Sequence, residues 1–252
     1  MRFTPQVREL DWLIERPIAH RGLHDVSRGI IENTKSAFEG AIARGYTIEC
    51  DLQLTADEAV VVFHDETLDR LTSERGLVIN RSARELQQVA ITGTSDHMQT
   101  LAEMLDQVAG KVPLVIELKT HWNRDVRLAR RALDILSAYR GQFALMSFDP
   151  DMVEAVAELA PMVTRGIVAD RCVDPYYAAL PIQRRLELRN LAHLVRTRPH
   201  FISYYFRELP FPPVQQIRAA GFPVITWTIR SKEEQSQALR YCDQVTFEGF
   251  LA

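Results

Sequence analysis

Short apolar runs alternate with amphipathic helical patterns along most of the chain. Each run is brief and rich in β-branched or aromatic residues, which favours strand over helix. The eight runs are Ile18–His20, Thr47–Asp51, Leu114–Lys119, Phe143–Phe148, Arg165–Ala169, Phe201–Phe206, Val224–Ile229 and Gln244–Glu248. Strands that alternate with helices are typical of an α/β protein with a parallel sheet.

Helical patterns fill the intervals between these runs. They cover Thr34–Arg44, Leu101–Val108, Arg127–Tyr139, Asp151–Leu159, Pro213–Ala220 and Lys232–Tyr241. Gly45 follows the first helix as a terminator, and Ser231 precedes the last as an N-cap. Eight strands in a chain of 252 residues predict a TIM (β/α)₈ barrel. An open doubly wound sheet is the alternative, but no G-x-G-x-x-G motif follows an early strand.

One segment interrupts this alternation. After the second strand, only the short turn Ala56–Glu58 separates two β-like runs. Parallel strands need a connection of about a dozen residues or more, so these two runs predict an antiparallel hairpin. Residues 52–100 are therefore expected to form an insertion above the carboxyl ends of the strands. No flexible linker divides the chain, and residues 1–252 are expected to form one catalytic domain.

Acidic residues end two neighbouring strands. Alternation along a strand places Glu49 and Asp51 on one face and Cys50 on the other, and it places Glu117 with Lys119. Two carboxylates about 4 Å apart repel by about 4 kcal/mol at an effective dielectric near 20. Such a group binds a cation or shifts a pKa, and oxygen ligands select Mg²⁺ or Ca²⁺. The alternative is that each acid pairs with a lysine or arginine inside the barrel.

Two histidines and an arginine stand near the same strand ends. His20 closes the first strand, and His64 follows the apolar run of the hairpin. A pair of histidines beside a metal would supply a general base and a general acid near neutral pH. Arg21 offers a planar guanidinium for a phosphate. For each residue taken alone, a structural role is the alternative.

The sequence resembles the glycerophosphodiester phosphodiesterase family. The resemblance covers nearly the whole chain and is densest from Ile18 to Thr72. It rests on five segments in a fixed order, namely IAHRG, ENT, IECDLQLT, VVFHDETLDRLT and LVIELK. Five such matches at compatible spacing are highly specific. The resemblance implies a TIM barrel with a small insertion after strand two, which agrees with the predicted hairpin.

The resemblance also implies roles for individual residues. The implied metal ligands are Glu49, Asp51 and Glu117, the acid–base pair is His20 and His64, the phosphate-binding residues are Arg21 and Lys119, and Glu32 and Asn33 support the site from a nearby loop. Asn33 would also serve as a plain helix cap. Trp227 matches an aromatic residue that the family places against the glycerol, and Phe148 is expected to line the same pocket. Trp227 as a core residue is the alternative.

The implied activity is metal-dependent hydrolysis of glycerophosphodiesters to glycerol 3-phosphate and an alcohol such as choline or ethanolamine, with Mg²⁺ or Ca²⁺ as cofactor. The attacking hydroxyl belongs to water or to the glycerol itself. We favour His20 as the base and His64 as the acid, although the sequence leaves their order open. A lysophospholipase D-like or cyclising activity on lysolipids is a second hypothesis. A non-catalytic barrel that acts as a binding protein is a third.

Three features depart from the family pattern. The last strand carries Glu248 where many relatives have Asp, and Ser203–Phe206 is unusually aromatic. Residues 170–199 follow no recognised pattern and include the basic run Arg184, Arg185 and Arg189. These features either reshape the pocket on the alcohol side or only pack against the barrel.

Charge and composition limit the partners. Thirty basic against 33 acidic residues give a formal charge of −3, so no global field attracts nucleic acid or an anionic membrane. No apolar run approaches the roughly 20 residues that span a bilayer, and residues 1–17 lack the apolar core of an export signal. Three scattered cysteines suit a reducing compartment. We expect a cytoplasmic protein with a small-molecule substrate, and the oligomeric state is left open.

Overall fold

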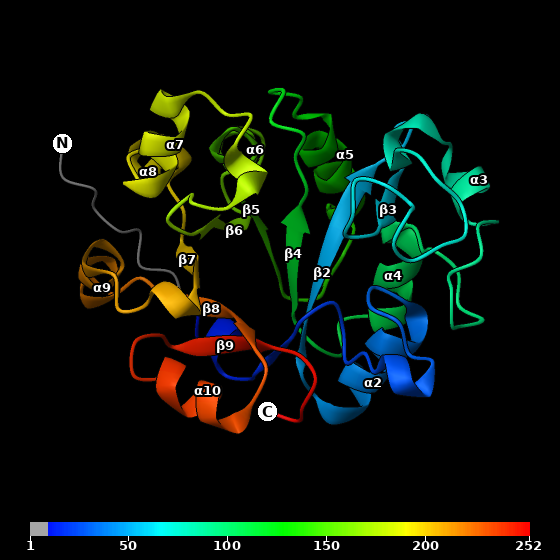
Figure 1. Cartoon of the computed structure of the whole chain (residues 1–252), viewed down its shortest axis with the longest axis horizontal. Helices are drawn as coiled ribbons and strands as arrows, with labels where there is room; N and C mark the ends of the chain where they lie inside the picture. The colour runs from blue at the N-terminus through cyan, green and yellow to red at the C-terminus, as the bar shows by residue number, and fades with distance from the viewer. Residues whose placement is uncertain (1–9) are drawn as a thin grey trace.

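Eight parallel strands close into a barrel in the computed structural model, which describes residues 10–252. The strands are β1 (Ile18–Ala19), β2 (Thr47–Leu54), β3 (Val60–Val62), β4 (Leu114–Leu118), β5 (Phe143–Ser147), β6 (Thr164–Ala169), β7 (Phe201–Tyr205), β8 (Val224–Ile229) and β9 (Gln244–Phe247). β1 pairs in parallel with both β2 and β9 and so closes the ring, and β3 is the antiparallel addition. The predicted TIM barrel is confirmed (Figure 1).

Helices cover the outside of the barrel. They are α1 (Asp11–Ile14), α2 (Lys35–Arg44), α3 (Ala83–Leu86), α4 (Leu101–Val108), α5 (Arg127–Leu136), α6 (Pro150–Leu159), α7 (Ile182–Arg189), α8 (Leu194–Thr197), α9 (Pro212–Ala219) and α10 (Lys232–Ala238), with short 3₁₀ turns η1 (Val26–Arg28), η2 (Val78–Asn80), η3 (Pro175–Tyr177) and η4 (Phe206–Glu208). The six predicted helices are present, with α5 and α10 ending three residues earlier than expected. The sequence patterns did not indicate α1, α3, α7 or α8.

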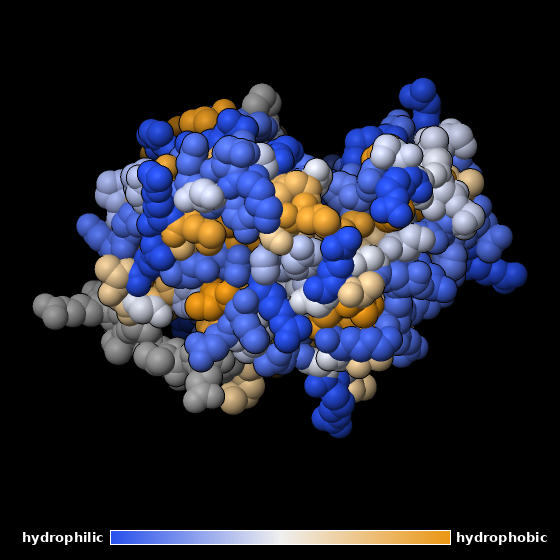
Figure 2. Space-filling view, turned by 90° about the horizontal axis from the view of Figure 1, so that it is seen from below, coloured by the Kyte–Doolittle hydropathy of each residue, from blue (hydrophilic) through white to orange (hydrophobic). Residues whose placement is uncertain are grey.

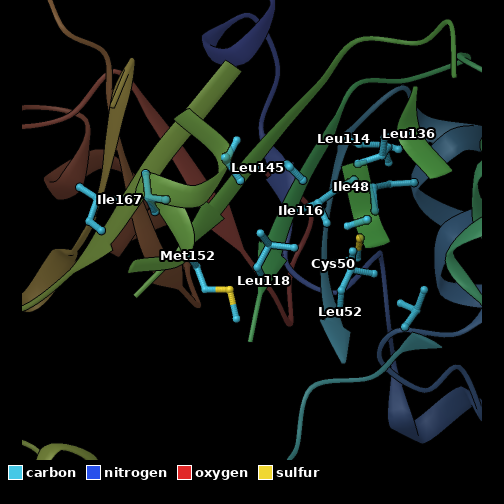
Figure 3. Packing of buried hydrophobic residues seen from close by; sticks show 14 of the residues in the cluster. Ile48, Cys50, Leu52, Leu114, Ile116, Leu118, Leu136, Leu145, Met152 and Ile167 are labelled. Atoms are coloured by element: carbon cyan, nitrogen blue, oxygen red, sulfur yellow. The ribbon is translucent and has the colours of Figure 1, made fainter. Parts of the chain in front are cut away.

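The strands separate two layers of core. Side chains such as Cys50, Ile116 and Leu118 face outward and pack with Leu136 of α5 and Met152 of α6 (Figure 3). The side chains that alternate with them point into the barrel, where Ile18, Val115, Met146, Phe201 and Ile225 pack together. Cys50 therefore faces the helices as predicted, and the acids beside it face the barrel interior.

The antiparallel hairpin follows the second barrel strand, as the short turn predicted. Leu52, Gln53 and Leu54 of β2 pair with Val62, Val61 and Val60 of β3. The chain that follows packs on a small core of its own, made by Val61, Phe63, Leu68, Val78, Ala83, Leu86 and Met98. Figure 1 shows this insertion and the α7–α8 segment on opposite sides of the upper ends of β2 and β4.

The surface has no continuous apolar face in the view of Figure 2, where hydrophobic residues form small patches among hydrophilic ones. Within residues 10–252, no helix has the length and hydropathy to cross a bilayer. The expectation of no export signal falls in part on residues 1–9, which lie outside the described residues.

Candidate active site

Three buried carboxylates meet at the carboxyl ends of β2 and β4. Glu49 and Asp51 are each 1% exposed and Glu117 is 8% exposed. Asp51 pairs in register with Glu117 across the two parallel strands. One oxygen from each of the three residues lies within 4.8 Å of the others. The structure thus brings together all three predicted metal ligands in one hard, oxygen-only donor set.

Basic groups offset part of this negative charge. Lys119 Nζ lies 2.8 Å from Glu117 Oε1 and 3.3 Å from Asp51 Oδ1, while Arg21 Nε lies 3.5 Å from Asp51 Oδ2. Burial alone would raise the pKa of Asp51, but the charges of Lys119, His64 and Arg21 lower it. Burial would lower the pKa of the Lys119 ammonium, and Glu117 and Asp51 raise it instead. Ion pairs therefore exist within the cluster, as the alternative interpretation expected.

Among the described residues, no lysine or arginine side chain lies within ion-pair distance of Glu49, and its contact of this kind is with His20 Nε2 at 4.0 Å. Burial, reinforced by the charges of Asp51 and Glu117, raises the pKa of its carboxyl well above the usual value. Its Oε2 accepts a hydrogen bond of 2.9 Å from the backbone N–H of Arg21. Three carboxylates with this residual repulsion fit a divalent cation, which would favour the charged form of Glu49.

The loop after β1 places its groups through an unusual backbone. Arg21 has a φ of 56° and Gly22 a φ of 80°. A Cβ at position 22 would lie 2.9 Å from the backbone of Ala37, so only glycine allows α2 to approach this closely. The resulting turn directs the Arg21 N–H at Glu49 and its guanidinium at Glu32, which accepts from Nη1 at 2.6 Å.

His20 is oriented by a contact with Glu248, the residue that follows the last barrel strand. Its Nδ1 lies 2.5 Å from Oε2 of Glu248, just after β9, and its Nε2 lies 4.0 Å from Glu49 Oε2. Burial lowers the pKa of His20, although the hydrogen bond to Glu248 opposes that shift. Glu248 also receives Arg230 Nη2 at 2.7 Å. The longer acid at position 248 still reaches the histidine.

His64 is oriented by its neighbour Asp65 in the insertion. Its Nδ1 lies 2.6 Å from Asp65 Oδ1, and the Arg70 guanidinium binds both Asp65 and Glu32 with two hydrogen bonds each. Glu32 in turn accepts from Arg21. Burial alone would raise the pKa of Glu32, but Arg70 and Arg21 lower it to about 2. A continuous chain of charged contacts therefore links His64 to the loop after β1.

Asn33 contacts the acidic cluster and does not cap the following helix. Thr34 is the N-cap of α2, whereas the Asn33 Nδ2 donates a hydrogen bond of 2.8 Å to Asp51 Oδ2. Its φ of 56° turns the side chain back toward β2. The charges of both His20 and His64 interact with Asp51. Asp51 is therefore the common neighbour of the predicted ligands, histidines and support residues.

A cavity of about 870 Å³ opens beside this cluster. His64 and Lys119 line one part of it, and Phe148 and Trp227 line another. The rings of Phe148 and Trp227 meet edge to face with centroids 5.4 Å apart. Lys119, Phe148 and Trp227 thus lie on the same cavity as His64, whereas His20 and Arg21 are not among the residues that line it. Trp227 is partly buried, and it packs against the inner core of the barrel as well as lining the cavity.

Several residues that line or shape this region were not predicted. Arg70 lies inside the segment VVFHDETLDRLT, but no sequence pattern indicates that its guanidinium binds both Asp65 and Glu32. Tyr176, Tyr177 and Tyr205 join Phe148 and Trp227 on the cavity. The sequence signals for them were the 170–199 segment without a recognised pattern and the aromatic Ser203–Phe206, which were expected either to reshape the pocket or only to pack against the barrel.

Comparisons with known proteins agree with this geometry. The glycerophosphoryl diester phosphodiesterase family model matches residues 20–247. The chain is 28% identical over 235 residues to a glycerophosphodiester phosphodiesterase of Caldanaerobacter subterraneus subsp. tengcongensis, a match that covers 88% of this chain and 89% of the relative.

Two solved structures share the fold. A phosphodiesterase of Oleispira antarctica, in complex with the product sn-glycerol-3-phosphate, has a TM-score of 0.76 at 22% identity and covers 92% of this chain and 91% of its own. A glycerophosphodiester phosphodiesterase of Thermotoga maritima has a TM-score of 0.70 at 25% identity and covers 91% of this chain and 92% of its own.

Proposed function

The chain belongs to the glycerophosphoryl diester phosphodiesterase family, and from that premise we propose that it hydrolyses glycerophosphodiesters to glycerol 3-phosphate and an alcohol by metal-assisted acid–base catalysis. One observation carries the proposal. Three buried carboxylates lie within 4.8 Å of one another, and each of two nearby histidines is held through Nδ1 by a carboxylate. This arrangement serves a cation and two proton transfers better than a structural salt bridge.

Glu49, Asp51 and Glu117 would hold the cation, and their oxygen-only set suits Mg²⁺ or Ca²⁺. When bound, the ion offsets the negative charge that develops on the phosphate oxygens. Arg21 and Lys119 contribute fixed positive charge at the same place, since both already contact the acidic cluster. These two groups would orient the phosphodiester before it reacts.

The histidines would move the protons. A proton on Nδ1 of His20, donated to Glu248, leaves Nε2 free to accept a proton from the attacking hydroxyl. His64, with Nδ1 donating to Asp65, would give a proton from Nε2 to the leaving alcohol. The attacking hydroxyl is that of water or the adjacent hydroxyl of the glycerol. The carboxylate partners fix the ring orientation of both histidines.

The test is a substrate assay on metal-stripped protein resupplied with Mg²⁺ or Ca²⁺. We expect glycerol 3-phosphate from glycerophosphocholine with at least one ion, and a cyclic phosphate detected by phosphorus NMR would identify the glycerol hydroxyl as nucleophile. Faster cleavage of lysophosphatidylcholine would instead support a lysolipid phosphodiesterase. Failure to cleave either ester with either ion would contradict the proposal and favour a binding protein.

We also propose a cytoplasmic location for the enzyme. Cys50, Cys172 and Cys242 are free thiols, which suits a reducing compartment. Cell fractionation that recovers the protein outside the cytoplasm would contradict this.

A further inference from the structure

The 170–199 segment supplies part of the cavity wall from outside the barrel strands. The lining residues that it contributes are Asp170, Val173, Asp174, Tyr176 and Tyr177. The Tyr176 ring meets Phe148 and Trp122 edge to face, with centroids 6.2 and 5.8 Å apart. Tyr176 is 49% exposed, so these ring contacts bury little area and do not fix the segment by themselves. A further contact is needed to hold the Tyr176 ring at the cavity.

Arg184 of α7 supplies that contact, because it joins the segment to the loop after β5. Its Nη2 donates a hydrogen bond of 2.7 Å to Asp149 Oδ1 and lies 3.0 Å from Asp151 Oδ1, and its Nη1 lies 2.8 Å from Glu187 Oε2. These contacts place α7 beside α6 at the upper ends of the strands (Figure 1). The Asp149 side chain is 3% exposed and that of Arg184 is 20% exposed. A charged hydrogen bond with so little solvent around it is weakly screened and keeps a defined geometry.

Asp149 is itself fixed by the barrel. Its backbone N–H donates to Ser147 Oγ at 3.1 Å, and that hydroxyl donates to the carbonyl of Leu118 in β4 at 2.7 Å. Its Oδ1 also caps α6 by accepting from the backbone N–H of Asp151 at 2.9 Å. Arg184 therefore joins a peripheral helix to a residue that both β4 and β5 hold in place.

The second carboxylate oxygen of Asp149 supports the cavity wall on the other side. Its Oδ2 accepts a hydrogen bond of 2.8 Å from Thr120 Oγ1, and Thr120 lines the cavity. The Thr120 hydroxyl accepts from the backbone N–H of Trp122 at 2.9 Å, and the Trp122 ring packs on Tyr176. One carboxylate thus holds two edges of the cavity, the loop after β4 through Thr120 and the 170–199 segment through Arg184.

We propose that Arg184 is a positioning residue for the substrate, because it holds Tyr176 at its place on the cavity wall through Asp149. The inference rests on the proposed function. Only residues 178–181 separate η3 from α7, so a shift of the helix moves the tyrosine ring with it. Arg184 acts on the shape of the cavity and makes no contact with the reacting phosphate.

The acidic cluster is held independently of this anchor. Lys119 precedes Thr120 in the chain, but its ammonium is fixed by Glu117 at 2.8 Å and by Asp51 at 3.3 Å. Loss of Arg184 should therefore weaken substrate binding and leave the chemical step unchanged. A substitution within the acidic cluster should have the opposite effect and lower kcat.

The experiment measures KM and kcat for glycerophosphocholine in Arg184→Met. We expect KM to rise about tenfold and kcat to stay within about twofold, which is the size of coupling through a network of contacts. Arg184→Lys can pair with Asp149 but cannot span three carboxylates, so it should recover part of the rise in KM. If Arg184→Met does not fold, an intermediate KM in Arg184→Lys supports the proposal and an unchanged KM overturns it.

Arg196→Met is the matched control. Arg196 belongs to the same ion-pair network, but among the described residues its ion pairs are with Asp151, Glu154 and Glu187 rather than with Asp149. Both substitutions should lower Tm by a similar amount, whereas only Arg184→Met should raise KM. An equal rise of KM in the two variants would show a purely structural role for Arg184 and overturn the proposal.

Hydrogen exchange separates this inference from the proposed function. Peptides that cover residues 171–181 should exchange about tenfold faster in Arg184→Met and at the normal rate in Arg196→Met. If no glycerophosphodiester is cleaved, the proposed function fails, and the exchange rates still test the anchor. If the enzyme is active and Arg184→Met changes neither KM nor exchange, the anchor is wrong while the activity stands.

Discussion

The acidic cluster and the aromatic side of the neighbouring cavity differ in how their charges are paired. On the side of the acidic cluster, which we call the metal side, the loop after β1 and the ends of β2 and β4 carry carboxylates that form ion pairs with Lys119, Arg21 and Arg70. On the other side, the ends of β5, β7 and β8 and the 170–199 segment carry rings, together with carboxylates that lack a basic partner among the described residues. The charges of the first side are paired before a substrate arrives. The second side, which we call the ring side, has carboxylates that remain unpaired.

The difference predicts which side controls rate and which controls selection. Pre-organised charges act on the reacting phosphate and affect turnover. Rings and unpaired carboxylates line the part of the cavity away from the acidic cluster, and we expect them to affect which substrate is bound. Substitutions on the metal side should therefore lower the activity on all substrates, and substitutions on the ring side should change the ratio between them.

The largest effect is expected from Asp51→Asn. This change keeps the size of the side chain but removes the carboxylate that Asn33, Lys119 and Arg21 all contact. Loss of a cation ligand removes several kcal/mol of charge stabilisation, so kcat/KM should fall by at least about a thousandfold at saturating Mg²⁺ or Ca²⁺.

Glu117→Gln should weaken metal affinity, measured by calorimetry, while circular dichroism reports an intact fold.

Asp134→Asn is the control for Asp51→Asn, because Asp134 is exposed on α5, far from the strand ends that carry the cluster. An Asp51→Asn enzyme with normal turnover and normal metal affinity would show that the cluster is a structural ion-pair network.

The next largest effect is expected from the histidines. His20→Ala and His64→Ala should each lower kcat by at least about a hundredfold, which is the usual scale for loss of an acid or base. Steady-state rates with glycerophosphocholine and glycerophosphoglycerol should fall together. Exposed His97→Ala should be silent. Near-normal rates in either active-site variant would remove that histidine from the mechanism, and a larger loss in Phe148→Leu would reverse the roles of the two sides.

The sequence predicted which acids of the metal side would lie together, and it predicted the ring side only in outline. Glu49, Asp51, His20 and His64 lie at strand ends or in a hairpin, and strand alternation fixes their direction once the strands are recognised. The role of Asn33 was harder to predict. An asparagine just before a helix can cap the helix or donate a hydrogen bond to Asp51, and the sequence does not distinguish the two.

The ring side depends on contacts between distant segments. Tyr176 reaches Phe148 and Trp122 only because η3 folds back over the ends of the strands. No periodicity predicts that return, since α7 and α8 are short and weakly patterned. Arg70 was missed for a similar reason, because its partner Glu32 is 38 residues away.

Arg70 tests how the insertion supports the metal side. Arg70→Met removes four hydrogen bonds to Asp65 and Glu32 and frees the carboxylate that holds His64. We expect kcat to fall ten- to a hundredfold with little change in KM, because a misplaced acid slows the reaction more than it weakens binding. Arg70→Lys should recover only part of the rate, since an ammonium lacks the planar fork.

The control for Arg70 is Arg75→Met in the same insertion, where the side chain is exposed. A loss in KM alone for Arg70→Met, or full recovery in Arg70→Lys, would mean that Arg70 contributes only general positive charge and does not position His64.

The smallest effect is expected from a buried histidine on the ring side. His193 is 1% exposed, and neither ring nitrogen has a hydrogen-bond partner among the described residues. Burial lowers its pKa to about 4, from about 6.5 in an unfolded chain. Between these values the unfolded chain binds the extra proton, so the free energy of unfolding should fall as the pH drops below 6.5.

The His193 contribution to that loss should be about 1–2 kcal/mol between pH 7 and pH 5. His193→Leu removes it, so urea unfolding of the variant should show a shallower pH dependence by that amount, while the exposed His97→Gln should match the unmodified protein. An unchanged slope in His193→Leu would mean that the folded segment accommodates the charged ring. The ring side would then tolerate a buried positive charge near Tyr177 and Asp170, and its carboxylates would be less free for a ligand than the comparison of the two sides requires.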